Sequence, residues 1–157
     1  YVQGEWTPEE RQLLICDLEL AASTLGLVAL QPLLRRQFVY SWTDNTVAMS
    51  AMRRMSPSTA AMQQLTAERA TWMLANGVGE AAERVTSAAN LWADMLSRGD
   101  EAGVLQQAAA LGLSTRRIDV PREWRALVGH AAWMRVHEHE GHAEGDPPSG
   151  VHLTPVA

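Results

Sequence analysis

The chain has 157 residues, 46% of them apolar, which is enough to bury the core of one domain. Its formal net charge of -5 argues against a protein whose whole surface binds nucleic acid, although local basic clusters remain. A single cysteine, Cys16, excludes an internal disulfide, and no stretch reaches the roughly 18 apolar residues of a membrane span. We therefore expect a soluble intracellular protein, cytoplasmic or nuclear, with no membrane partner.

The first two predicted elements are a helix over residues 18–29 and a strand over residues 38–43. Apolar residues recur at helical spacing along the first segment, and Asp17 is placed to cap it. The second segment, FVYSWT, is rich in aromatic and β-branched residues and lacks a polar alternating face. We therefore expect a largely buried strand, closed by Asp44 and Asn45.

The rest of the chain is predicted to be mainly helical. Ser56 is placed to cap a helix that has Pro57 at its first position, and Asn90 is placed to cap a later one. A segment with Val85 and Thr86 is a weaker strand candidate. The predicted helices cover residues 47–55, 57–76 and 91–98 and lie around residues 104–111 and 121–134, and the predicted strand covers residues 81–87.

These elements predict an α/β domain with one core and ragged ends. Residues 1–99 form the domain, and residues 100–136 are interpreted as an appended helical extension that packs on it. Residues 137–157 are polar, rich in His, Gly and Pro, and show no periodicity. We expect them to form a disordered tail.

Three acidic residues occupy distinctive positions. Glu19 lies in a Leu-Glu-Leu sequence early in the first helix, Asp44 follows the strand in Thr-Asp-Asn, and Asp94 lies in the helical sequence NLWADMLSR. Each has an ordinary explanation by itself, as a group that complements a helix dipole, a turn residue or a solvated side chain. Their contexts and order together suggest a shared role.

In this order the three motifs resemble the ribonuclease H domain of reverse transcriptases, particularly those of retroelements. In that family a Leu-Glu-Leu helix supplies one carboxylate, a Thr-Asp-Asn strand end the next, and an Asn-x-x-Ala-Asp-x-Leu-Ser-Arg helix the last. The sequence GEWTPEE at residues 4–10 also resembles the segment that precedes the first helix. The resemblance covers residues 4–98, and it implies a helix-rich ribonuclease H-like α/β fold with an incomplete mixed sheet and appended C-terminal helices.

The resemblance also implies a chemistry. Glu19, Asp44 and Asp94 would be catalytic residues that bind magnesium, an ion that prefers hard oxygen ligands. Two such ions hydrolyse the RNA strand of an RNA–DNA hybrid, one by activating water and one by stabilising the leaving oxygen. A reverse transcriptase domain would lie upstream in the same polyprotein.

Two features depart from the family pattern. The family's first strand, which carries a further catalytic Asp, has no counterpart before Tyr1, and the loop before Asp94 reads TSAA where the family often has a His. Asp17 does not replace the missing acid, because two positions along a helix turn it roughly 200° away from Glu19. We therefore expect hydrolysis by this chain alone to be impaired.

The basic residues are the predicted contacts to nucleic acid. Arg53 and Arg54 lie on the helix directly after Asp44, and together with Asn45 they are the expected nucleic-acid-binding residues. The arginine pairs at residues 35–36 and 116–117 are further candidates for phosphate contacts. The alternative for all three pairs is that they are solvated helix ends.

Other signals are interpreted as structural. Asp44 and Glu80 have an integrase-like spacing, which we attribute to coincidence because Glu80 is predicted to lie in a loop. The histidines at 137, 139 and 142 lack a scaffold for a metal, and the six Trp residues are assigned mostly to the core. The competing interpretation of the whole chain is a non-catalytic retroelement remnant or protein-interaction module with vestigial acids.

Overall fold

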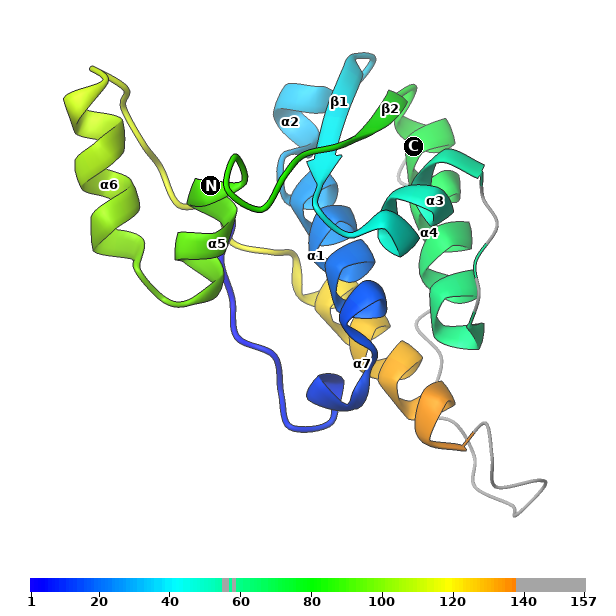
Figure 1. The fold of residues 1–157 in the computed structure, drawn as a ribbon. Helices are drawn as coiled ribbons and strands as arrows, with labels where there is room; N and C mark the ends of the chain where they lie inside the picture. The colour runs from blue at the N-terminus through cyan, green and yellow to red at the C-terminus, as the bar shows by residue number, and fades with distance from the viewer. Residues whose placement is uncertain (55–56, 58, 138–157) are drawn as a thin grey trace.

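The structure, a computed structural model, describes residues 1–54, 57 and 59–137 (Figure 1). Within them it is a helix-rich α/β fold with a small sheet, as the sequence predicts at this level. The elements are η1 (Glu10–Gln12), α1 (Ile15–Ala29), α2 (Gln31–Leu34), β1 (Phe38–Thr43), α3 (Thr46–Arg54), α4 (Ala60–Asn76), β2 (Gly79–Arg84), α5 (Leu91–Ser97), α6 (Glu101–Ala110) and α7 (Arg122–His137).

The sheet consists of β1 and β2, which pair in parallel from Phe38 opposite Gly79 to Thr43 opposite Arg84. Parallel strands need a long crossover connection, which α3 and α4 provide here. β1 has the predicted bounds, whereas β2 begins two residues earlier than predicted and includes Glu80, so the prediction of a loop at Glu80 is wrong. A mixed sheet was expected, whereas the sheet within the described residues is a single parallel pair of strands.

The prediction that β1 is largely buried is wrong. Phe38, Tyr40 and Trp42 are 62%, 60% and 61% exposed, and only the alternate side chains face the helices. Successive side chains of a strand point to opposite faces, so a strand covered on one side buries every second residue. An aromatic run therefore does not by itself indicate burial on both faces.

Asp17 belongs inside α1 and not before it. The helix begins at Ile15, and the Asp17 carboxylate accepts hydrogen bonds from the backbone N–H of Leu14 (3.2 Å) and from Thr59 Oγ1 (2.9 Å). The carboxylate is fully buried. Asp17 therefore closes the first turn of α1 from within and ties it to the start of α4.

α4 begins three residues later than the sequence predicts. Thr59 is its N-cap, because Thr59 Oγ1 accepts a hydrogen bond from the backbone N–H of Met62 at 3.0 Å. Ser56, the predicted cap, lies outside the described residues. The helix ends as predicted at Gly77, whose φ of 65° is the left-handed conformation that glycine adopts without steric cost.

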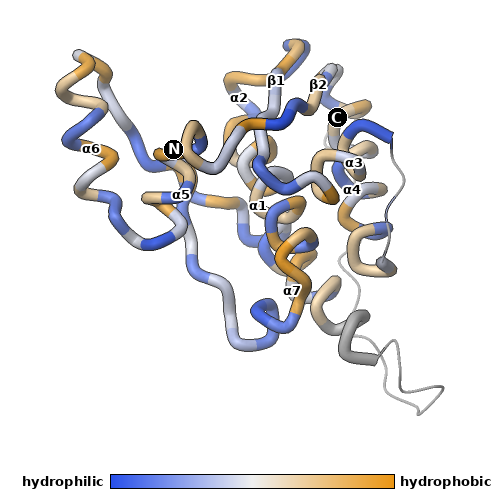
Figure 2. Tube along the Cα trace, viewed as in Figure 1, coloured by the Kyte–Doolittle hydropathy of each residue, from blue (hydrophilic) through white to orange (hydrophobic). Residues whose placement is uncertain are grey.

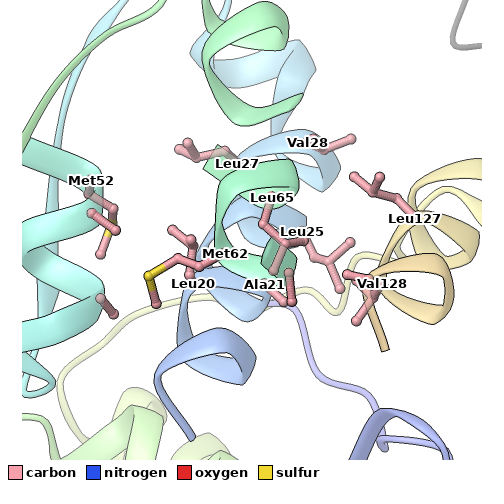
Figure 3. Packing of buried hydrophobic residues seen from close by; sticks show 14 of the residues in the cluster. Leu20, Ala21, Leu25, Leu27, Val28, Met52, Met62, Leu65, Leu127 and Val128 are labelled. Atoms are coloured by element: carbon pink, nitrogen blue, oxygen red, sulfur yellow. The ribbon is translucent and has the colours of Figure 1, made fainter. Parts of the chain in front are cut away.

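The core lies where α1, α4 and α7 meet (Figure 3). Leu20, Met62 and Leu65 have no exposed surface, and Val128 of α7 is 1% exposed within the same cluster. α7 thus shares the core of residues 1–99, although the sequence suggested an appended extension. α6 packs against α5, away from this core (Figures 1 and 2).

α7 also contacts the N-terminal segment through Arg125. Arg125 forms an ion pair with the buried Glu10 at 2.6 Å, and its guanidinium lies 4.9 Å from the centre of the Trp6 ring. Across the described part of the chain, no helix is long and apolar enough to cross a membrane. The predicted tail was to begin at residue 137, but His137 is the last residue of α7. The rest of the predicted tail, with the histidines at 139 and 142, lies outside the described residues.

Candidate functional site

A cleft of about 560 Å³ opens at the carboxyl end of β1. Its lining comes from the N-terminal segment, α1, β1 and α5, and it includes Glu19, Asp44 and Asp94. The structure therefore brings the three predicted acids from a helix, a strand end and a second helix to one cleft. This is the location expected of an α/β site, beyond the carboxyl ends of the strands.

Two of the carboxylates are held by hydroxyl groups. Glu19 Oε2 accepts a hydrogen bond from Thr43 Oγ1 at 2.8 Å, which links α1 to the last residue of β1. Asp44 Oδ2 accepts one from Ser87 Oγ at 2.9 Å. Both carboxylates keep other lone pairs for further hydrogen bonds or for a cation.

Asp94 has a cationic partner. Its Oδ1 accepts a hydrogen bond from Arg98 Nε at 3.0 Å, in an i,i+4 ion pair along α5. The side chains of Arg98 and Asp94 are 75% and 47% exposed, so water screens the pair and it contributes little to stability. A stronger competitor for the Asp94 carboxylate would therefore displace Arg98 at small cost.

The oxygen donors of the cleft suit magnesium by their chemistry, because carboxylates and hydroxyls are hard ligands. Among residues 1–54, 57 and 59–137, no group of three or more His, Cys, Asp or Glu is arranged so that it could hold a metal ion. Glu19, Asp44 and Asp94 would have to approach one another before they could share a cation.

The predicted nucleic-acid contacts, Asn45, Arg53 and Arg54, are not among the residues that line the cleft. Asn45 caps α3, because its Oδ1 accepts hydrogen bonds from the backbone N–H groups of Val47 (2.9 Å) and Ala48 (3.0 Å). Arg53 forms an ion pair with Glu83 of β2 at 2.6 Å. Arg54 is exposed at the end of α3.

A buried ion pair lies directly behind the cleft. Arg69 of α4 is 1% exposed and pairs with Glu80 of β2 through both Nε and Nη2. Arg69 Nη2 also donates to Ser23 Oγ at 3.2 Å, and Ser41 Oγ donates to Glu80 Oε1. Ser23 and Ser41 both line the cleft, so this pair fixes two hydroxyls of its wall.

The two tryptophans that line the cleft were not predicted from the sequence. Trp72 and Trp124 are buried in the core, as expected, but Trp6 and Trp42 line the cleft. The signal that distinguishes Trp42 is the period-two spacing of aromatic residues in FVYSWT, which places all three rings on one face of the strand.

Comparisons with protein-family models, with curated proteins and with solved structures give no match. The interpretation of the cleft therefore depends on its residues, their sequence contexts and their positions.

Proposed function

We propose that the chain is a ribonuclease H-like domain of a retroelement reverse transcriptase polyprotein, with a cleft suited to magnesium-dependent hydrolysis of RNA in RNA–DNA hybrids. One observation carries the proposal. Three acids that lie in separate elements, each in a sequence context of that family, line a single cleft. Carboxylates that share one cleft attract cations, and their oxygen atoms suit magnesium.

Glu19, Asp44 and Asp94 would hold the magnesium, which when bound supplies an activated water and stabilises the leaving oxygen. The chain itself contributes orientation. The hydroxyls of Thr43 and Ser87 fix one oxygen each of Glu19 and Asp44. These hydrogen bonds orient the two carboxylates, which would still have to approach each other and Asp94 to share a cation.

Hydrolysis by the chain alone is expected to be impaired, because the cleft lacks a further acid. Within the described residues β1 pairs with β2 along one edge only, and Ser41, Trp42 and Thr43 of β1 line the cleft. A strand added to the second edge of β1 would use its unpaired backbone groups. An Asp on that strand would complete a four-carboxylate site.

Terbium binding tests the metal site without requiring activity. Tb³⁺ takes the same oxygen ligands, and Trp6 and Trp42 are placed to sensitise its luminescence. We expect a luminescence signal that Mg²⁺ competes away and that Asp44→Asn weakens at least tenfold in affinity. Asp119→Asn, at an exposed acid outside the cleft, is the matched control. Equal Tb³⁺ affinity in the two variants would show that Asp44 does not bind the ion and would refute the proposed metal site.

A gel assay with a labelled RNA–DNA hybrid tests the chemistry. The chain is expected to cleave no faster than background in Mg²⁺, and a version extended by an Asp-bearing strand that pairs with β1 is expected to cleave. Asp44→Asn controls for contaminating nuclease in both cases. Cleavage by the chain alone that Asp44→Asn abolishes would show that three acids suffice.

The second candidate function is a non-catalytic interaction module. The exposed aromatic face of β1 favours it, because large contiguous apolar surface commonly marks a contact site. In that case Glu19, Asp44 and Asp94 are solvated acids, and neither Tb³⁺ nor Mg²⁺ binds in the cleft. The terbium experiment thus separates the two functions.

A further inference from the structure

Three aromatic rings form a continuous ladder on the exposed face of β1. The centres of the Phe38 and Tyr40 rings are 5.5 Å apart in an edge-to-face contact, and those of Tyr40 and Trp42 are 6.0 Å apart and stacked. Opposite Phe38 and Tyr40, β2 presents only Gly79 and Ala81. These small residues leave the rings uncovered, with each about 60% exposed.

Glycine at position 79 is required by this arrangement. A Cβ built there would lie 2.6 Å from Cδ2 of Phe38, which is closer than non-bonded carbon atoms approach. The Phe38 ring therefore lies over the backbone of β2 at Gly79. This contact keeps the Phe38 ring, the first of the ladder, on the exposed face of the sheet.

Charge is distributed unevenly along this aromatic ladder. Arg35 and Arg36 are exposed and lie before the Phe38 end of β1, separated from it by Gln37. At the other end, the residue of β2 opposite Trp42 is Glu83, which forms an ion pair with Arg53. Trp42 itself lines the cleft. The ladder thus runs from a cationic end into the carboxylate cleft.

We propose that the aromatic ladder binds a single-stranded nucleic-acid segment, whose bases stack on Phe38, Tyr40 and Trp42 and whose phosphates contact Arg35 and Arg36. The inference rests on the proposed function, because it supplies the path by which a strand next to the hybrid enters the cleft. Stacking on aromatic rings tolerates any base sequence, since every base has a π face.

The exposure of the rings favours a single strand. Bases in a duplex are stacked on one another about 3.4 Å apart and present no free face to a protein ring. Unpaired bases can stack on exposed aromatic side chains, and the three rings are each about 60% exposed. An added polypeptide strand would use the edge of β1, so it would leave this face open.

Anisotropy of a fluorescein-labelled 12-nucleotide single-stranded RNA tests the proposal. Measurement in EDTA removes any contribution of metal in the cleft. We expect Tyr40→Ala and Phe38→Ala each to weaken binding about tenfold, in line with the loss of one stacked base. Leu74→Ala is the matched control, because Leu74 is 84% exposed on α4 and lies outside the ladder.

Salt dependence tests the two arginines. A double substitution of Arg35 and Arg36 by Ala should reduce the slope of log affinity against log salt by roughly 1.4, the value for two phosphate contacts on a single strand. The slope of Tyr40→Ala should equal that of the unchanged chain, because a ring carries no charge. An unchanged slope of log affinity against log salt in the arginine variant would show that Arg35 and Arg36 do not contact the phosphates.

The outcomes separate this inference from the proposed function. Unchanged RNA affinity in both ring variants, with Tb³⁺ binding still sensitive to Asp44→Asn, would overturn the ladder and leave the cleft intact. Weaker RNA binding in both ring variants, with Tb³⁺ binding unaffected by Asp44→Asn, would support the ladder as a binding surface and refute the metal site in the cleft. Sedimentation that shows a dimer, dissociated by Tyr40→Ala, would identify the face as a contact between two copies and would also overturn the inference. Phe38 and Tyr40 are exposed, so circular dichroism should show an unchanged fold.

Discussion

Replacing Arg69 with methionine tests how far the fold depends on the ion pair behind the cleft. The side chains of Arg69 and Glu80 are 1% and 4% exposed, so the substitution leaves the Glu80 carboxylate without its cation and without access to water. Removing one partner of a buried pair costs about 3–5 kcal/mol. Domains of this kind have a total stability of roughly 5–15 kcal/mol, so about a fifth or more of it would be lost.

The remaining hydrogen bonds of Arg69 change this figure little. Thr24 Oγ1 loses the hydrogen bond from Arg69 Nη1 (3.1 Å) but still donates to the backbone oxygen of Leu20 at 2.8 Å. Ser23 lies at the cleft, where water can replace the guanidinium. The buried carboxylate therefore dominates the loss.

Urea unfolding followed by tryptophan fluorescence measures the effect. With an m-value of about 2 kcal/mol/M, we expect Arg69→Met to lower the midpoint by roughly 2 M. The double variant Arg69→Met/Glu80→Gln should regain most of the loss, because no buried charge remains. Arg98→Met, which breaks the exposed pair with Asp94, should cost less than about 1 kcal/mol. A double variant as unstable as the single one would refute the argument that an isolated buried charge causes the loss.

Three further substitutions test other parts of the structure by the same unfolding measurement. Leu20→Ala, at a fully buried site in the core, should cost about 2–5 kcal/mol, whereas Leu33→Ala, at a 66% exposed site, should stay within about 0.5 kcal/mol. Asn45→Ala should cost about 1 kcal/mol through loss of the α3 cap and should leave RNA affinity unchanged; weaker RNA binding would make Asn45 a nucleic-acid contact. Gly79→Ala should cost about 1 kcal/mol, because its Cβ displaces the Phe38 ring; no loss would mean that this ring is not held against β2.

The candidate acids were predictable from sequence because each lies in a local motif. Glu19, Asp44 and Asp94 were identified from the residues next to them, and the structure brings them to one cleft. Their hydroxyl partners were not predictable. Thr43 and Ser87 reach Glu19 and Asp44 through the pairing of distant elements, and no local pattern marks a hydroxyl as a second partner.

By itself the sequence determined the elements whose signals are local. The bounds of β1 and the end of α4 at Gly77 follow from β-propensity and the freedom of glycine. α5 begins after Asn90 as predicted, although the Asn90 side chain makes no capping hydrogen bond. These signals involve interactions within a few residues along the chain.

Only the tertiary structure decided which faces are covered. FVYSWT reads as a buried strand, yet helices cover one side of β1 and leave Phe38, Tyr40 and Trp42 exposed. Asp17 was predicted to be a helix cap, yet its carboxylate is buried against Thr59. Glu80 was predicted to lie in a loop, yet it lies in β2 and forms a buried ion pair with Arg69. Burial and ion pairing depend on contacts between residues far apart in sequence, which composition and periodicity do not encode.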